Sequence, residues 1–291
     1  MDLTTSFCVI DDFCNLFEQK MNHRLLSDGE DKRKRSMRLS LSEILTIMIY
    51  YPHSGYKTFK DYYTKNDELR TSFHLVSYNR FIELRNKASI MLYLFVQLKA
   101  KGLNTGIAYI DSFPLKVSHL KRMYSHKTFK KLAKKGKTST GWFFGFKVHL
   151  VINHKGEILA FMITVGNVAD NNRKLVDHLT RNVKGLLFGD KGYIGKELFE
   201  SLFKKGIKLV TKIRSNMKNI LIDPTEKSLL KKRGVIESVG AVLKGSLSLE
   251  HSRHRSIKGF LSHILSCLAS YSFREKKPSI IPQKRPSIQT A

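Results

Sequence analysis

Three carboxylates, those of Asp111, Asp190 and Glu237, stand in surroundings that suit metal-dependent chemistry. Asp111 ends the run Gly106-Ile107-Ala108-Tyr109-Ile110-Asp111, whose apolar, β-prone residues predict a strand buried on both faces. Burying a carboxylate is costly unless a positive group lies against it, and the run contains no Lys or Arg. A divalent cation is one natural partner, because carboxylate oxygens are the ligands that Mg²⁺ prefers.

Asp190 ends a second run of this kind, Gly185-Leu186-Leu187-Phe188-Gly189-Asp190. A tight turn, Lys191-Gly192-Tyr193-Ile194-Gly195, follows it. Open α/β sheets place their sites at the carboxyl ends of strands. We therefore expect Asp111 and Asp190 to lie at the C-terminal ends of two strands of one sheet.

Glu237 has a cation on either side of it in the sequence, Arg233 four residues before and Lys244 seven residues after. On a helix that begins near Lys231, these three side chains fall within roughly 40° of one line. One helix face then presents a carboxylate flanked by two cations. Taken alone, Arg233 and Glu237 could instead form a surface ion pair worth less than about 1 kcal/mol.

Three other acids compete with Glu237 for the third position. Glu226 follows Pro224 in an expected loop, and Glu197 and Glu200 lie on the helix expected after Asp190. None of them has the flanking cations, and Glu237 is therefore preferred.

The N-terminal part of the chain is expected to be helical. Apolar spacing predicts a helix over residues 5–20, Ser40-Leu41-Ser42-Glu43 forms a capping box for a helix that ends at Tyr51, and a short helix covers Thr58–Lys65. Ser77 caps a further helix, whose buried stripe is Phe81, Leu84, Ala88, Met91, Leu92 and Phe95. These helices carry Arg70, Arg80, Arg85 and Lys87, which fits either a helix-turn-helix-like DNA-binding module or a plain helical bundle.

After the turn-rich segment Gly102–Gly106 the pattern changes to strands and helices in alternation. Strands are expected over Phe143–Val151, Ile158–Thr164, Gly185–Asp190 and Ile207–Lys212, with helices over Asn171–Asn182 and Lys196–Lys204. A hairpin turn, Asn153-His154-Lys155-Gly156, joins the first two strands, and a basic loop, Arg214–Lys232, precedes the helix of Glu237. The fold class is therefore α/β, a mixed sheet flanked by helices and preceded by a small all-α domain.

The formal net charge of +28 and the pI near 10 indicate a polyanionic partner, and nucleic acid is the obvious one. From Ser112 to Leu150 there are ten Lys and Arg residues and no acid, with Trp142 among them. Such a run could be a solvated face, but next to a buried carboxylate it fits a groove for a phosphate backbone better. A basic ribosomal or histone-like protein is the alternative, although such chains are usually shorter and poorer in aromatic residues.

Other sequence features argue against several classes of protein. Three scattered cysteines, Cys8, Cys14 and Cys267, indicate neither a disulfide framework nor a zinc site, and suggest a reducing cytosol. No signal peptide or membrane span is visible, so we expect a soluble, cytoplasmic protein. Gly136-Lys137-Thr138 is not the end of a P-loop, because Lys131 stands where that motif needs a glycine. The tail from Lys276 is rich in Pro, Ser, Lys and Arg and is expected to be disordered.

The order Asp, Asp, Glu, with two acids after strands and one on a late helix, resembles the DDE transposases of bacterial insertion sequences. Ile110-Asp111-Ser112 is similar to that family's first-acid motif and Gly189-Asp190-Lys191-Gly192-Tyr193 to its second. Arg233, Glu237 and Lys244 match its signature of Arg, three residues, Glu, six residues and Lys, although Leu230 stands where many members have Tyr. Ser77-Tyr78-Asn79-Arg80-Phe81 and His251-Ser252-Arg253-His254-Arg255 resemble the subgroup called nine-eighty-two.

The resemblance implies an RNase H-like catalytic core and phosphoryl transfer on DNA by two Mg²⁺ ions, for which Mn²⁺ can substitute. Asp111 would bridge the ions, and Asp190 and Glu237 would each hold one. Water would be the nucleophile for cleavage at the element ends, and the freed 3′-hydroxyl the nucleophile for joining to target DNA. The expected domains are 1–101, helical and DNA-binding; 102–273, catalytic with a basic insertion; and 274–291, the tail.

The expected partner is double-stranded DNA, both terminal inverted repeats and target, bound by a homodimer in the bacterial cytosol and nucleoid. The expected DNA contacts are Arg233, Lys244, Lys121, Arg122, Lys130, Lys131, Lys134, Lys135, Lys137, Trp142, Lys147, Lys191, Arg253 and Arg255, with His149 as a further candidate. Two alternatives stay open. One is a nuclease of the same fold that cuts without joining, and the other is an inactive or domesticated sequence-specific DNA-binding protein.

Overall fold

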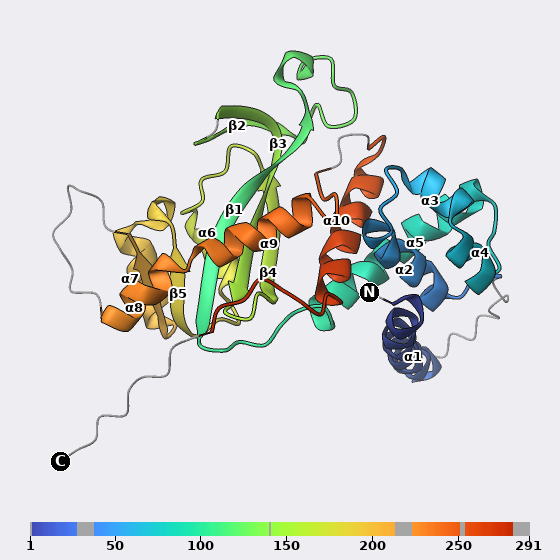
Figure 1. Cartoon of the computed structure of the whole chain (residues 1–291), viewed down its shortest axis with the longest axis horizontal. Coiled ribbons are helices and arrows are strands. Elements are labelled where there is room, and N and C mark those ends of the chain that lie inside the picture. The colour runs from blue at the N-terminus through green and yellow to red at the C-terminus, as the bar shows by residue number, and fades with distance from the viewer. Residues whose placement is uncertain (1, 28–37, 140, 213–222, 251–253, 282–291) are drawn as a thin grey trace. The chain divides into compact units, whose positions relative to one another are not determined.

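The computed structural model of the chain describes residues 2–27, 38–139, 141–212, 223–250 and 254–281 (Figure 1). The chain forms two compact units. The helical unit comprises residues 1–100, 243–249 and 254–275, and the sheet unit comprises residues 101–242, 250–253 and 276–291. These units are not the consecutive domains expected from the sequence, because the expected catalytic range 102–273 includes residues 254–273, which pack in the helical unit.

The helical unit contains α1 (Leu3–Ser27), α2 (Leu41–Tyr50), α3 (Phe59–Lys65), α4 (Asp67–Ser72), α5 (Tyr78–Leu98) and α10 (Ile257–Ser272). The start signals act as predicted: Ser40 and Glu43 form a capping box, and Ser77 caps α5. Helix α4 was not expected, and it is capped by Asn66, whose side chain accepts a hydrogen bond from the Leu69 N–H. No helix among the described residues is long and apolar enough to cross a membrane.

The sheet unit holds a mixed sheet of β1 (Ile107–Ser118), β2 (Lys134–Thr138), β3 (Gly141–Asn153), β4 (Ile158–Val165), β5 (Gly185–Gly189) and β6 (Ile207–Thr211). The order is β2-β3-β1-β5-β6, with β4 also on β3. Strands β1, β5 and β6 are parallel, and β3 runs antiparallel to β1, β2 and β4. The predicted mixed α/β sheet with flanking helices, preceded by a helical region, is confirmed.

Helices cover both faces of this sheet. On one face α6 (Arg173–Leu179) and α7 (Lys196–Lys204) pack on Ala108 and Ile110 of β1 in a shared hydrophobic core. On the other face lie α8 (Pro224–Lys231) and α9 (Gly234–Lys244), the latter crossing β1 in Figure 1. There the Tyr109 hydroxyl donates to the Leu229 carbonyl over 3.4 Å. Successive side chains of β1 thus alternate between the two helical layers.

Strand β1 is longer than the sequence suggested, and Asp111 lies inside it rather than at its end. Pairing with β5 stops at Tyr109, whereas pairing with β3 on the other edge continues to Ser118. Asp111 therefore stands just beyond the last parallel pair, on a strand that is still held on one side.

Several other expectations need correction. The basic stretch before Trp142 contains strand β2, because its backbone pairs with β3 from Lys134 to Thr138. The loop expected over residues 214–232 contains α8 from Pro224 onward, and residues 213–222 lie outside the described part. The expected disordered tail is ordered as far as Ile281: Ile280 is buried, and its N–H donates to the His154 carbonyl over 2.7 Å. Residues 282–291 lie outside the described residues.

A substitution at Gly145 would test how closely β1 and β3 pack. A Cβ there would collide with the Leu115 carbonyl oxygen. We expect Gly145→Ala to lower the free energy of unfolding by about 1–3 kcal/mol, measured by chemical denaturation. Gly234→Ala is the control, because a Cβ at Gly234 meets no atom within 4 Å and should cost nothing. Equal stability of the two variants would contradict this packing.

Candidate active site

The parallel pairing of β1 and β5 brings two of the predicted acids to one level. Ile107 pairs with Leu186 and Tyr109 with Phe188, and the same register continued by two residues sets Asp111 beside Asp190. Asp190 follows β5 directly and caps the 3₁₀ turn Lys191–Tyr193, its Oδ1 accepting from the Gly192 N–H over 2.7 Å. The pairing of β1 with β5 thus brings both acids to the same end of this strand pair, two residues beyond its last paired position.

Arg233 joins Asp111 to Glu237. Its Nη1 lies 3.1 Å from Asp111 Oδ2, and its Nη2 lies 2.8 Å from Glu237 Oε1. Arg233 precedes α9, which begins at Gly234, so the expected helix face is corrected: Glu237 and Lys244 lie on α9 and Arg233 reaches in from the turn before it. The positive partner of Asp111 in this structure is thus Arg233.

Asp111 is an unusual carboxylate. Its pKa is raised to about 6, mainly by burial, and the nearby carboxylates of Asp190 and Glu237 contribute to the rise. The Ser112 N–H, which donates to Asp111 Oδ1 over 2.8 Å, and the Arg233 guanidinium act in the opposite direction. The ionised form of Asp111 therefore needs positive charge nearby, and the Arg233 guanidinium supplies part of that charge.

The residues suit a divalent ion by donor chemistry, since the carboxylates of Asp190 and Glu237 are near the partly buried carboxylate of Asp111. They do not form a closed cage as they stand. Among the described residues, no three His, Cys, Asp or Glu side chains are close enough to hold a metal ion together. The guanidinium of Arg233 takes the cationic position between Asp111 and Glu237.

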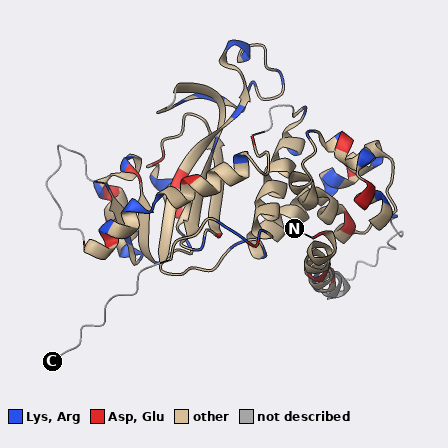
Figure 2. Cartoon of the chain, viewed as in Figure 1, with Lys and Arg blue, Asp and Glu red and all other residues tan. Residues whose placement is uncertain are grey.

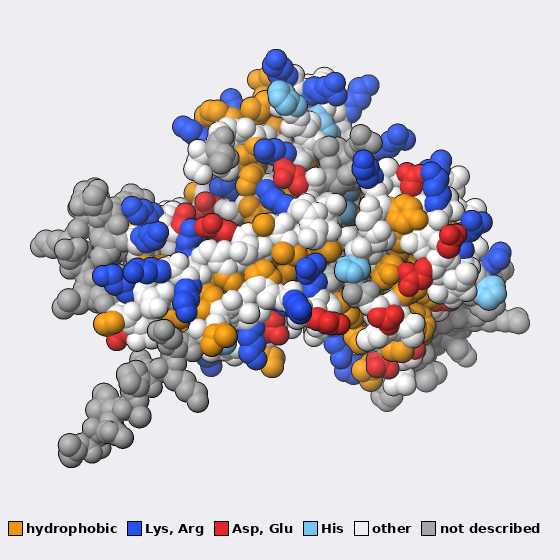
Figure 3. Space-filling view, in the orientation of Figure 1, with side chains coloured by type: hydrophobic (Ala, Val, Ile, Leu, Met, Phe, Trp, Pro, Cys, Tyr) orange, Lys and Arg blue, Asp and Glu red, His pale blue; other side chains and the backbone are white. Residues whose placement is uncertain are grey.

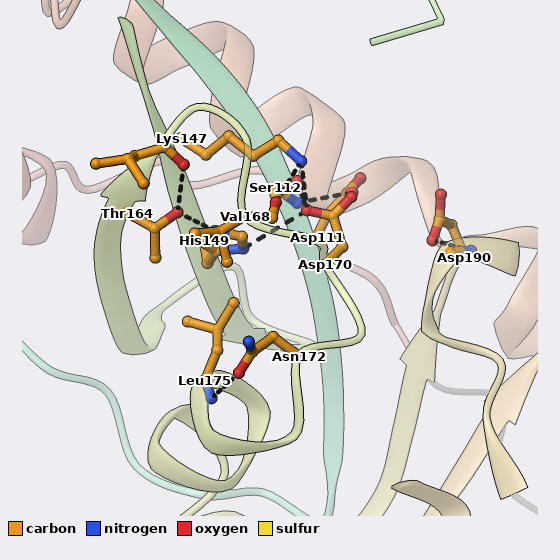
Figure 4. A network of polar contacts seen from close by, with 12 residues as sticks. Asp111, Ser112, Lys147, His149, Thr164, Val168, Asp170, Asn172, Leu175 and Asp190 are labelled. Carbon is orange, nitrogen blue, oxygen red and sulfur yellow. Dashed lines mark hydrogen bonds and ion pairs between the residues drawn. The ribbon is translucent and has the colours of Figure 1, made fainter. Parts of the chain in front are cut away.

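A second polar cluster, missed in the sequence, lies on the opposite face of β1 (Figure 4). Its centre is Asp170, in the segment between β4 and α6. Asp170 Oδ1 accepts from the Ser112 hydroxyl over 2.7 Å and from Lys147 Nζ over 3.1 Å. Lys147 also donates to the Val168 carbonyl over 3.0 Å. The signal that could have revealed this cluster is the pair Lys147 and His149, two polar residues within an apolar strand that need polar partners when buried.

His149 completes this cluster. Its side chain is fully buried, its Nε2 lies 2.9 Å from the Thr164 hydroxyl, and its Nδ1 lies 3.8 Å from Asp170 Oδ1. Burial lowers the pKa of the imidazole to about 4, with Asp170 opposing that shift and Lys147 adding to it. His149 and Lys147 are therefore built into the interior, which corrects the expectation that they contact DNA.

The other predicted DNA contacts in the β2–β3 region lie on the surface. Lys134, Lys135 and Lys137 are exposed on β2, and Trp142 at the start of β3 is 53% exposed. Lys135 Nζ lies 4.4 Å from the centre of the Trp142 ring and Lys137 Nζ lies 5.6 Å from it. Figures 2 and 3 show the Lys and Arg residues along this part of the chain. We call residues 134–142 the basic ribbon.

The remaining predicted contacts are spread over both units. Exposed positions are taken by Lys121, Arg122, Lys130, Lys131, Lys191 and Arg255, and Lys244 is half-buried at the end of α9. Arg253, with His251 and Ser252 of the subgroup motif, lies outside the described residues. In the helical unit, Arg80 pairs with Glu83 over 2.6 Å and Arg85 lies over the Phe59 ring at 5.6 Å.

The rival acids are placed away from the cluster of Asp111 and Glu237. Glu226 lies on α8 rather than in a loop, and its Oε1 is 2.6 Å from Lys208 Nζ on β6. Glu197 and Glu200 are exposed on α7. Glu237 is thus the acid that the structure links to Asp111, through Arg233.

The chain is similar to several known proteins. A family model described as the transposase DDE domain matches residues 101–257, just over half of the chain. The chain is similar to piggyBac transposase in a synaptic complex with hairpin DNA, with 11% identity and a TM-score of 0.45 over 83% of this chain and 68% of that one. It is also similar to the Mos1 strand transfer complex, with 14% identity and a TM-score of 0.25 over 87% and 83%. No match is found among curated proteins.

His149 should make stability depend on pH. Its pKa is about 4 in the folded chain and near 6.5 when unfolded, so between these values the unfolded chain binds more protons. The free energy of unfolding should therefore fall as pH falls from 6.5 to 4, by up to about 3 kcal/mol for this group. We expect His149→Gln to flatten the fall in denaturation experiments at several pH values.

The matched control is His178→Gln on the exposed surface of α6. This variant should keep the wild-type fall, because its imidazole stays in water. If His149→Gln showed the same pH dependence as the wild type, the buried neutral imidazole described above would be wrong.

Proposed function

Because the chain belongs to the transposase DDE domain family, we propose that it cleaves DNA at the ends of a mobile element and joins those ends to target DNA. The observation that carries the proposal is the grouping of Asp111 with Asp190 by strand register and with Glu237 through Arg233. These are the three acids whose order and spacing match the family's signature. A transposase of a bacterial insertion sequence is the form of this activity that the motifs favour.

The three carboxylates would hold divalent metal ions, Mg²⁺ or Mn²⁺. Asp111, at the centre, would bridge two ions, and Asp190 and Glu237 would each bind one. When bound, such ions activate the attacking oxygen and stabilise the leaving oxygen in an in-line displacement. The partial burial that raises the pKa of Asp111 would also strengthen the attraction between its carboxylate and a bound cation.

Arg233 has a defined part in this proposal. Its two contacts keep Asp111 and Glu237 from repelling each other before DNA and metal bind. Binding of a metal by these carboxylates would compete with the guanidinium, which could then turn to a phosphate of the DNA. Lys244, on the same helix as Glu237, is proposed as a further phosphate contact.

The basic ribbon is the proposed DNA-binding surface of the sheet unit. Its lysines stand around an exposed Trp142, a combination that suits a phosphate backbone with an aromatic ring beside it. The rest of the +28 net charge would add attraction that does not depend on sequence. We propose that the helical unit binds the terminal repeats and that two copies of the chain act on paired ends.

The catalytic proposal is tested with a labelled duplex that carries the element's own end, incubated with Mg²⁺, Mn²⁺ or EDTA. We expect cleavage and joining that need metal and that Asp111→Asn, Asp190→Asn and Glu237→Gln each abolish, while DNA binding persists. Glu226→Gln is the control and should cleave normally, because Glu226 is paired with Lys208.

Each other outcome has a definite meaning. Cleavage that survives Glu237→Gln would move the third acid elsewhere. Cleavage without joining would indicate a nuclease, and end-specific binding without cleavage under any metal would indicate an inactive DNA-binding protein.

The basic ribbon is tested by the salt dependence of DNA binding. Lys135→Ala and Lys137→Ala should each weaken binding and reduce the slope of log affinity against log salt by about 0.9, the value for one phosphate contact. Lys155→Ala is the control, because this exposed lysine lies in the turn at the other end of β3. Slopes that are equal in all three variants would exclude the ribbon as a phosphate contact.

A further inference from the structure

The cluster around Asp170 is not used by the proposed chemistry, yet it is one residue away from Asp111. Asp170 is 30% exposed, and Lys147 and His149 beside it are 10% and 0% exposed. Burying these groups costs free energy that an apolar core would not cost. A role in the function of the protein would explain why these charged and polar groups are buried at this position.

Ser112 links this cluster to the candidate metal site. Its hydroxyl donates to Asp170 Oδ1 over 2.7 Å, and its backbone N–H donates to Asp111 Oδ1 over 2.8 Å. Because neighbouring side chains of a strand point to opposite faces, Asp111 and Ser112 are directed into different layers. The Asp170 contact thus holds Ser112 from the far side of the sheet.

Lys147 fixes Asp170 in turn. It stands on β3 opposite Pro114 of β1, so its backbone position is set by the central strand pair. Its ammonium group holds both Asp170 and the Val168 carbonyl, which ties the segment between β4 and α6 to the sheet. A chain of contacts therefore runs from Lys147 through Asp170 and Ser112 to the Asp111 carboxylate.

We propose that Asp170 is a positioning residue for Asp111. Held by Lys147, it fixes Ser112, and the Ser112 N–H then orients the Asp111 carboxylate for metal binding. This inference rests on the proposed function, in which Asp111 is a metal ligand. Supporting residues of this kind typically change metal affinity or activity by about 10- to 100-fold when they are replaced.

The molecule offers a matched control for Asp170. On α6, Asp177 Oδ1 accepts from Lys205 Nζ over 2.6 Å and from the Ser201 hydroxyl over 3.2 Å. Asp177 therefore shares with Asp170 a lysine and a serine partner, with Arg173 as its third neighbour where Asp170 has His149. Loss of stability caused by removing a carboxylate should appear in variants of both Asp170 and Asp177. Loss of metal affinity should appear only in variants of Asp170.

The experiment measures Mn²⁺ binding to the full chain by electron paramagnetic resonance of the free ion, alongside Mn²⁺-dependent cleavage of the end duplex. Ser112→Ala and Asp170→Asn should weaken Mn²⁺ binding about 10-fold or more and shift cleavage to higher Mn²⁺ concentrations. Ser112→Thr keeps the hydroxyl and should bind like the wild type. Asp177→Asn and Ser201→Ala should also bind like the wild type.

A double variant distinguishes two roles of Asp170: positioning Asp111, or only neutralising the charge of Lys147. Asp170→Asn leaves Lys147 without its carboxylate and could weaken folding, whereas Lys147→Met with Asp170→Asn removes both charges. If Asp170 only neutralises Lys147, this double variant should recover both stability and Mn²⁺ affinity. Positioning predicts recovered stability with Mn²⁺ affinity still lowered.

The outcomes also separate this inference from the proposed function. Unchanged Mn²⁺ affinity in Ser112→Ala and Asp170→Asn would overturn the positioning of Asp111. Binding of Mn²⁺ by the wild type without cleavage would contradict the proposed function. The Mn²⁺ affinities of the Ser112 and Asp170 variants, compared with the wild type, would still test whether Asp170 positions Asp111. Absence of Mn²⁺ binding by the wild type would overturn this inference and the metal part of the function together.

Discussion

The sheet unit depends on two cations that balance the carboxylates on either side of β1. On one face the Arg233 guanidinium stands between Asp111 and Glu237, and on the other the Lys147 ammonium holds Asp170. Burial raises the pKa of Asp111, and repulsion from the carboxylates of Asp190 and Glu237 adds to that rise. The protein can place them there because each face supplies a positive group from a different segment, one from the turn before α9 and one from β3.

These two cations are of different kinds. Arg233 contacts carboxylates that would bind metal, and its side chain is only partly buried, so its contacts can be exchanged. Lys147 is enclosed, and its partners are a carboxylate and a carbonyl of the fold itself. Replacement of a protein cation by a bound one is therefore expected only on the face of β1 that carries Arg233. On the other face, Lys147 keeps its contacts with Asp170 and Val168.

Local signals in the sequence predicted much of the fold. Capping residues such as Ser40 and Ser77, and the apolar runs before Asp111 and Asp190, depend on neighbours within a few residues, and the structure agrees with them. The match between Asp111 and Asp190 followed from the rule that sites lie where parallel strands end. Strand β2 was missed because lysine-rich residues form a strand there only through pairing with β3.

The Asp170 cluster and the bridging position of Arg233 could not be predicted for a related reason. Asp170 lies 58 residues from Ser112 in the sequence, and Arg233 lies 122 residues from Asp111, so only the folded chain brings them together. The same holds for Lys147, which a basic run groups with exposed lysines although burial sets it apart. Charge patterns describe partners of the whole molecule, whereas the role of one charged residue depends on where the fold puts it.

Strand β3 has a consequence for how the length of this chain can vary. It is paired along one edge by β1 and along the other first by β2 and then by β4. Inserting or deleting one residue within it would turn Lys147 and His149 to the opposite face and uncouple three neighbours at once. The connection from residue 119 to residue 133 belongs to no strand, so added residues there would leave the pairing of β3 and the positions of the acids unchanged.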